Sequence, residues 1–228
     1  MLQHLKEDGY KYILEILVIT LGILGAFALN NWNENRKDRV LEQELLAQLL
    51  IELREDVARF KIWSEDHKQV SRHTRQVLYA LKNDLPMTDT LLEDFKKITS
   101  PFGFVYSQTT YENLSTVGFH TIQDRELRSN VQRLYNSSLS QFDEIMKILN
   151  DEFLLTINVQ QQEHLIIGEW EIHRGNNVPR DYEALKDNFV FQNTFADAAS
   201  QHAIVSITLN QLVDEMEEII KQIEEALS

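Results

Sequence analysis

The chain has 228 residues, a net charge of −14 and no cysteine. A surface this acidic repels nucleic acid and anionic lipid, so neither is expected to bind the main body of the protein. The lack of cysteine excludes disulfides, thiolate metal ligands and cysteine nucleophiles. Only 7 glycines and 3 prolines occur, and they cluster, leaving three long stretches without helix breakers.

The first predicted element is a transmembrane helix. Residues 12–29 carry a single charge, Glu15, and as a helix would span about 27 Å, close to the hydrocarbon core of a bilayer. Tyr10 and Tyr12 at one end and Trp32 at the other lie where interfacial aromatic residues belong. We therefore predict a short tail over residues 1–11, a membrane helix over residues 12–32, and the lipid bilayer as a partner.

A cleaved signal peptide is the main alternative for this segment. Lys6 and Lys11 would form its basic region, and the small residues Ala26 and Ala28 have the spacing of a cleavage site. Glu15 would then fall inside the apolar region of the signal peptide, where an acid is unusual. The sequence therefore favours an uncleaved anchor.

The membrane helix has two different sides when its residues are placed 100° apart. Small residues on one side would let a second helix approach closely, because packing drives helix association in lipid. We predict that this side contacts another copy of the chain or another membrane protein. The alternative is a monomeric anchor whose small residues only reflect the usual composition of membrane helices. The predicted contact face consists of Glu15, Ile19, Gly22, Ala26, Asn30 and Asn33.

Glu15 is the only acid within the apolar run. It lies about one turn inside Tyr12, where a carboxylate can reach the headgroups or be neutralised. A proton relay or ion path would more often place its acid nearer the middle of the membrane. A packing or interfacial role for Glu15 is therefore favoured over an ion-conducting one.

The same helix is predicted to continue beyond the membrane. Apolar residues recur at helical spacing from Leu41 to Leu81, and Pro86 ends the pattern. Two short helices follow, one from Asp89 to Ser100 and one over residues 107–117.

The remainder of the chain predicts two further long helical stretches. One begins after Asp124 as N-cap and reaches about Leu165, and the other covers residues 182–227 with a possible break near Phe191. Residues 168–181 contain Gly and Pro and are predicted to form a loop. Because no alternating strand pattern persists, the fold class is all-α, with residues 33–228 forming a soluble antiparallel helical bundle.

Three segments resemble an uncharacterised bacterial family of single-pass membrane proteins. The stretch GILGAFALNNWNENRK is similar to the family signature GILIALQINNWNE, and it departs from that signature at Gly25 and Ala26. TYENLSTVGFHTIQDRELRSNVQRLY resembles the middle motif of the family, and LVDEMEEIIKQIEEALS resembles its closing helix. The basic residues that flank the membrane helix are too balanced to fix its orientation. The resemblance implies a cytoplasmic N-terminus and a bundle outside the inner membrane, and it implies no established activity.

No catalytic or metal-binding constellation is recognisable. The Glu-x-x-His pairs of di-metal bundles are absent, as are phosphate-binding loops and the Gly-x-Ser-x-Gly motif. The seven histidines are scattered along the chain, and isolated histidines of this kind are usually structural or solvated. We therefore expect no enzyme activity, no metal and no cofactor.

The middle motif is the most plausible partner surface outside the membrane. The alternative is a helical corner that needs these residues to fold, because Gly permits a turn and Asp caps a helix, and this structural interpretation is the favoured one. Its candidate residues are Tyr111, Gly118, Asp124, Arg125 and Arg128.

Three functions remain open from the sequence. The favoured one is a membrane-anchored interaction or scaffold protein that assembles with itself or with a larger membrane complex. The second is a sensory module outside the cytoplasm that acts through a partner, for which a pocket in the bundle would be the supporting feature. The third is an ion-conducting or proton-coupled subunit that uses Glu15.

Overall fold

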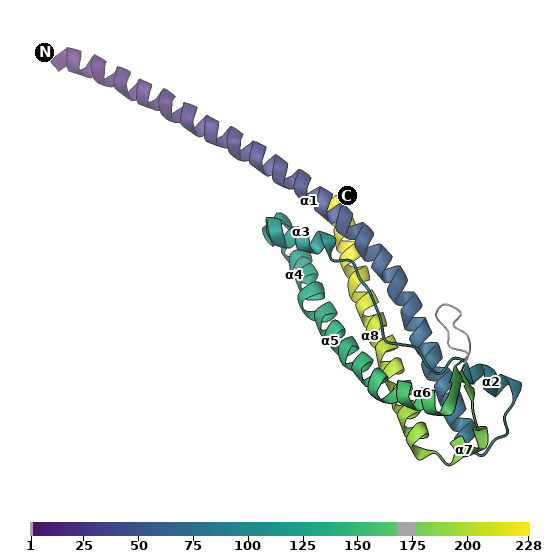
Figure 1. Cartoon of the computed structure of the whole chain (residues 1–228). Coiled ribbons are helices and arrows are strands. Elements are labelled where there is room, and N and C mark those ends of the chain that lie inside the picture. The colour runs from purple at the N-terminus through teal and green to yellow at the C-terminus, as the bar shows by residue number, and fades with distance from the viewer. Residues whose placement is uncertain (1, 168–176) are drawn as a thin grey trace.

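The protein is an all-α molecule built around one very long helix (Figure 1). The computed structural model describes the backbone of residues 2–167 and 177–228, and the side chains of residues 14–166 and 177–228. Helix α1 runs without interruption over Leu2–Lys82. It ends where Asp84 adopts a positive φ of 51°, two residues before Pro86, whose ring prevents the helix from continuing.

Three helical rods form the bundle (Figure 1). The second half of α1 packs along α8, which covers Phe189–Leu227 and runs in the opposite direction. The third rod is a continuous helical path that includes two π-helical segments. It consists of α4 (Arg125–Arg133), η2 (Leu134–Leu139), α5 (Ser140–Glu152), η3 (Phe153–Ile157) and α6 (Asn158–His164).

Short elements close the two ends of the bundle. The end near the C-terminus carries α3 (Thr109–Val117) and the 3₁₀ turn η1 (Phe119–Thr121) (Figure 1). The remaining short helices and the two strands lie at the opposite end (Figure 1). We call that opposite end the far end, because it lies away from the N-terminal part of α1. It holds α2 (Asp89–Phe95), β1 (Leu165–Ile167), β2 (Asn177–Pro179) and α7 (Tyr182–Lys186).

Two sequence predictions need correction at the far end. No strand was expected, yet β1 and β2 pair antiparallel, with Ile166 opposite Val178. Strands of three residues are too short to produce a recognisable alternation. The break predicted near Phe191 lies slightly earlier, between α7 and α8, where the Asn188 side chain accepts a hydrogen bond from the Phe191 N–H and caps α8.

The bundle has two separate apolar cores along its length. The near core joins α1 to the third rod and to the C-terminal half of α8, around buried residues such as Leu49, Phe60 and Met216. The far core surrounds Phe95 and Phe191, at the end where α2 and the hairpin lie. Between the two cores, most of the buried side chains of α1 are polar.

Candidate functional site

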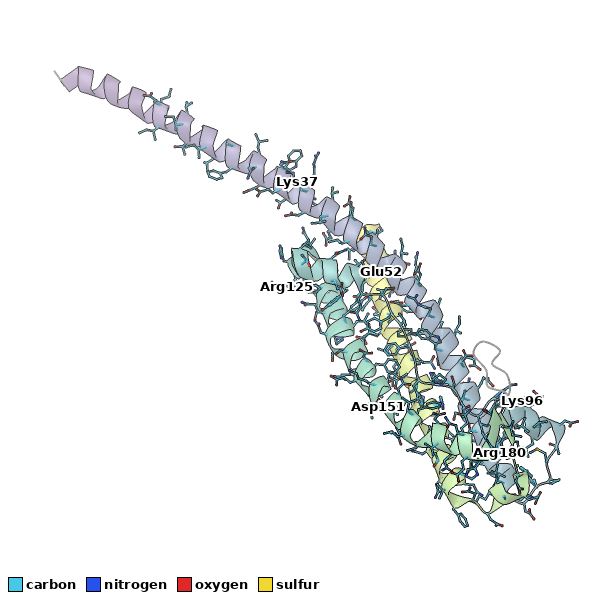
Figure 2. The ribbon with its side chains drawn as sticks, viewed as in Figure 1. Lys37, Glu52, Lys96, Arg125, Asp151 and Arg180 are labelled. Atoms are coloured by element: carbon cyan, nitrogen blue, oxygen red, sulfur yellow. The ribbon has the colours of Figure 1, made fainter. Side chains whose placement is uncertain are left out.

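The apolar N-terminal segment of α1 is not covered by any other part of the described chain (Figure 2). Every side chain from residue 14 to residue 40 is exposed, and Leu17, Leu21 and Phe27 are 53%, 61% and 63% accessible. This is the one helix among the described residues that is long and apolar enough to cross a membrane.

The predicted contact face lies along one side of this exposed helix. Glu15, Ile19, Gly22, Ala26, Asn30 and Asn33 all fall within the uninterrupted α1. A Cβ atom added at Gly22 would meet nothing within 4 Å. Among the predicted interfacial anchors, Trp32 is exposed, with the Arg36 guanidinium 5.9 Å from the centre of its ring. The side chains of Tyr10 and Tyr12 lie outside the described residues.

The middle motif forms a helical corner at the end of the bundle that carries α3 and η1, which we call the near end. Gly118 ends α3 with φ of 102°, and the Asp124 side chain accepts a hydrogen bond from the Leu127 N–H at the start of α4. Arg128 donates to the Ile122 carbonyl at 3.1 Å, and Tyr111 stacks on Tyr135 with ring centroids 4.3 Å apart. Arg125 is exposed at the first position of α4. Of the five residues, four therefore have a structural part in the corner.

Acidic side chains of α1 bind the end of the segment that connects α2 to α3 and leads into this corner. Glu52 accepts hydrogen bonds from the backbone and hydroxyl of Thr110, and Asp56 accepts one from the Ser107 N–H at 2.9 Å. Asp56 is almost fully buried and also contacts Arg59, and its burial raises the pKa of the carboxyl above the usual value. These contacts explain why the connection lies along the bundle rather than in solvent.

A polar layer separates the near core from the far core. Between α1 and α8, the Ser64 hydroxyl donates to the Ser206 carbonyl at 3.0 Å, and the Ser71 hydroxyl donates to the Ala199 carbonyl at 2.6 Å. Such small residues allow the two helices to approach closely. We define the polar layer as Ser64, His67, Ser71, Thr74, His202 and Ser206, all of which are buried.

Two histidines meet at the centre of the polar layer. His67 and His202 lie 2.7 Å apart between their Nδ1 atoms, and the ring of His202 stacks on Phe102 with centroids 4.4 Å apart. Burial lowers the pKa of His67 to about 4, and burial followed by repulsion from His67 holds the pKa of His202 well below its usual value. At neutral pH both rings are thus uncharged, and one Nδ1 donates a hydrogen bond that the other accepts.

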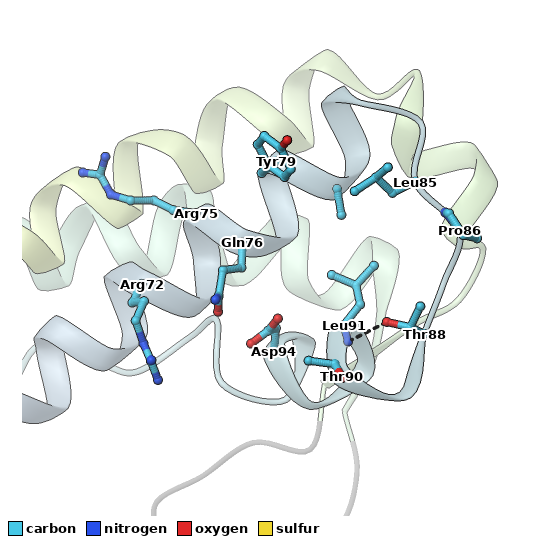
Figure 3. A pocket seen from close by; sticks show the side chains of 11 residues that line it. Arg72, Arg75, Gln76, Tyr79, Leu85, Pro86, Thr88, Thr90, Leu91 and Asp94 are labelled. Carbon is cyan, nitrogen blue, oxygen red and sulfur yellow. Dashed lines mark hydrogen bonds between the residues drawn. The ribbon is translucent and has the colours of Figure 1, made fainter.

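A pocket opens at the far end between the last turns of α1 and helix α2 (Figure 3). We call it the far pocket; its volume is about 500 Å³, within the range of small-molecule sites. Leu85, Pro86 and Leu91 lie toward one side of it, while Arg72 and Arg75 lie at the other (Figure 3). Its remaining lining residues are Gln76, Tyr79, Ala80, Thr88, Thr90 and Asp94.

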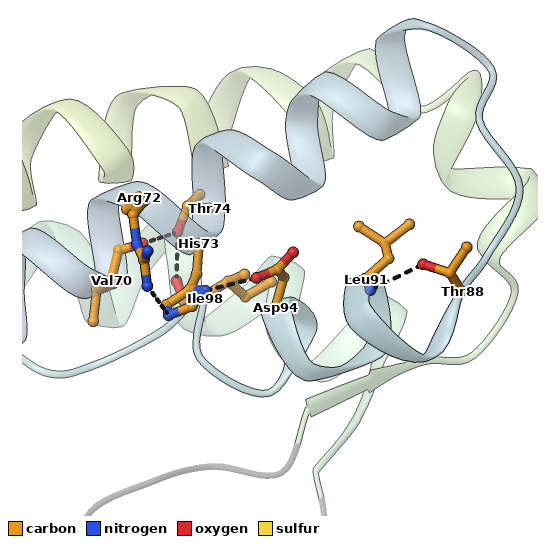
Figure 4. A network of polar contacts seen from close by, with 8 residues as sticks. All are labelled: Val70, Arg72, His73, Thr74, Thr88, Leu91, Asp94 and Ile98. Carbon is orange, nitrogen blue, oxygen red and sulfur yellow. Dashed lines mark hydrogen bonds and ion pairs between the residues drawn. The ribbon is translucent and has the colours of Figure 1, made fainter.

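The wall of the far pocket is held by a polar network between α1 and α2 (Figure 4). His73 Nδ1 lies 2.7 Å from Asp94 Oδ1, and both residues are buried. Thr74 donates to the Val70 carbonyl at 2.7 Å and lies 3.2 Å from the Ile98 carbonyl that follows α2. The network fixes α2 against α1 and so sets the width of the pocket.

The far pocket, the histidine pair and the His73–Asp94 contact were not predicted from the sequence. The prediction that the histidines are isolated is wrong for His67 and His202, which are 135 positions apart in the chain and yet in contact. A weak signal existed for His67, which falls on the same apolar stripe of α1 as Phe60.

The described side chains contain no group of three or more metal-ligating residues placed to hold a metal ion. Comparison of the chain with known protein families, with curated proteins and with solved structures gave no match. The functional interpretation therefore depends on the exposed apolar helix, the far pocket and the polar layer.

Proposed function

We propose that this chain is a membrane-anchored helical interaction protein, which assembles with itself or with a larger membrane complex. The observation that carries the proposal is the exposed apolar segment at residues 14–29 of α1. Exposing apolar surface to water costs about 25 cal/mol per Å². A bilayer removes this cost, because the helix already satisfies its own backbone hydrogen bonds.

The proposed location is the inner membrane, with the N-terminus in the cytoplasm and the bundle outside it. This orientation is supported by the family resemblance of the segment around Trp32. We expect the protein to stay in the membrane fraction after alkaline extraction, and its intact mass to include residues 1–29. A reporter that folds only in the cytoplasm, fused after Ser228, should be inactive. Release of a shortened protein would instead establish a cleaved signal peptide, and an active reporter would reverse the orientation.

The proposed contact face provides a test of assembly. Gly22→Leu places a large side chain on this face, and it should weaken oligomers at least tenfold in a membrane association assay. Because a Cβ at Gly22 meets nothing in the monomer, the substitution should leave the bundle intact. Ala28→Leu adds the same bulk on the opposite side of the helix and should change little, as should Leu21→Ala. Equal effects from both faces, or the absence of any oligomer, would remove the contact face from the proposal.

A second candidate function is a sensory module that acts through a partner. The far pocket favours it, because the pocket has the volume of a small-molecule site and combines apolar walls with several polar groups. A compound that binds there should change the oligomeric state or the partner bound by the intact protein. A bound compound that changes neither would refute the sensory role.

A further inference from the structure

We propose that the far pocket binds an organic anion with an apolar body, such as an aromatic or branched monocarboxylic acid. The proposal names the chemical class of ligand for the pocket that favours the sensory role, and it can succeed or fail independently of the membrane anchor.

The first argument is the positive charge of Arg72 and Arg75 at one end of the pocket, which Glu65 offsets only through a longer-range attraction to Arg72. Neither Arg72 nor Arg75 forms an ion pair with a carboxylate among the described residues. Arg75 donates from Nε to the Ser71 hydroxyl at 3.3 Å, and an Nη atom of Arg72 lies 3.4 Å from His73 Nε2. Within the part of the chain that the structure describes, most guanidinium donors of both residues are therefore free for an acidic group, which an arginine binds in a fixed fork geometry.

The charge of the whole chain makes this local excess of cations notable. Acidic residues outnumber basic ones by fourteen. Arg72 and Arg75 lie one turn apart on α1, with their guanidinium groups pointing away from each other in Figure 3, and they give this end of the pocket a local excess of positive charge on a negative molecule. An anion is attracted to this position and repelled by most of the remaining surface.

The second argument is the apolar surface at the other end of the pocket. Leu85, Pro86 and Leu91 lie on the side away from the arginines, with Tyr79 above them in the view of Figure 3. Burying the body of a ligand against these groups would supply the larger part of its binding energy. The ligand must therefore be amphipathic, with its acidic group at the arginine end.

Asp94 sets a further condition on the ligand. Its Oδ1 is occupied by His73 at 2.7 Å, and its carboxylate lies beside Gln76 in the pocket wall (Figure 3). A second acidic group on the ligand near this position would be repelled. A single acidic group is therefore expected, and Asp94 favours ligands with a hydroxyl or amide hydrogen in the middle of the molecule.

The test uses the full chain in lipid nanodiscs and two matched probes. One is 1-naphthaleneacetate, and the other is 1-naphthaleneacetamide, which has the same shape without the charge. Binding is measured by isothermal titration calorimetry, with empty nanodiscs subtracted to remove partition into lipid. We expect the acid to bind at least tenfold more tightly than the amide.

Variants then locate the bound probe. Arg72→Gln and Arg75→Gln should each weaken the acid about tenfold or more, since a hydrogen bond to a charged group is lost, and should leave the amide unchanged. Thr90→Trp, at an exposed position of α2 in the pocket lining, should fill the pocket and abolish binding of both probes. Arg54→Gln removes an exposed arginine of the same helix, paired with Glu224 outside the pocket, and should have no effect. Circular dichroism confirms that each variant is folded.

Several results would overturn the inference. The first is equal affinity for the acid and the amide. The second is a loss of affinity for the acid in Arg54→Gln that is as large as the loss in Arg75→Gln. The third is undetectable binding of the acid at millimolar concentration. A tightly bound acid that leaves both the oligomeric state and the bound partner unchanged would uphold the ligand class and refute only the sensory role.

Discussion

The buried histidine pair should make the stability of the bundle depend on pH between pH 7.5 and pH 5. His67 has a pKa of about 4 in the folded protein, against 6.5 for an ordinary histidine, and the pKa of His202 is also lowered. The unfolded chain therefore binds protons that the folded bundle excludes. Above about pH 6.5 the pair does not reduce the free energy of unfolding. Below that pH the free energy of unfolding decreases progressively as the pH falls toward 4.

The size of the effect follows from the two pKa values of His67. Linkage over the interval from pH 7.5 to pH 5 gives a loss of about 2 kcal/mol from this residue alone. His202 changes stability in the same direction. Asp56, whose pKa is raised by burial on folding, acts in the opposite direction, and it is unchanged in the matched variant described next.

The assay is a urea titration of the full chain in a mild detergent at both pH values. Trp63, which packs against the near core, reports unfolding by its fluorescence in a background with Trp32→Phe and Trp170→Phe. The matched variant His67→Leu/His202→Phe removes both titrating rings and keeps an aromatic ring against Phe102. Its free energy of unfolding should change by less than half as much between the two pH values. A wild-type protein with no pH dependence, or a variant that loses just as much stability, would refute the reasoning.

Two further predictions concern the corner of the middle motif. Gly118→Ala should destabilise the protein by about 1–3 kcal/mol, because φ is 102° and the added Cβ would lie 2.5 Å from the His120 ring. The control Gly103→Ala, where nothing lies within 4 Å of the added Cβ, should cost less than about 0.5 kcal/mol. Equal losses of the free energy of unfolding in urea titrations of the two variants would contradict this account. Asp124→Ala should cost about 1 kcal/mol through loss of the α4 cap, measured as a lower thermal midpoint, whereas a midpoint no lower than that of Arg125→Ala would show that the cap is unimportant.

The long helices of this fold could be predicted because they depend on local sequence. The absence of Gly and Pro between Gly25 and Pro86 is sufficient to predict the extent of α1 after the apolar segment, and Asp124 and Gly118 mark helix ends through their own backbone chemistry. The all-α class is accordingly confirmed. The orientation in the membrane, the oligomer and the partner remain predictions.

The far pocket and the polar layer could not be predicted because they depend on contacts between distant segments. His67 meets His202 only once α8 packs antiparallel to α1, and the sequence pattern does not fix the register of that packing. The pocket depends on where α2 lies after the turn at Asp84, which is set by the buried His73–Asp94 contact. Periodicity identifies the side of a helix that is buried, but it does not identify the partner of each residue.

The polar layer gives the packing of α1 on α8 a defined register. The apolar stripes of two long helices can also pack when one helix slides by a turn, at modest cost. Such a slide would separate His67 from His202 and Ser64 from Ser206, leaving buried polar groups without partners. The pocket end is thereby fixed relative to the near end.

Among the described residues, α1 alone belongs both to the far pocket and to the exposed apolar segment, roughly 80 Å away along the helix. Any effect of a bound anion on the exposed apolar segment must therefore pass through α1 or through a partner that contacts both ends.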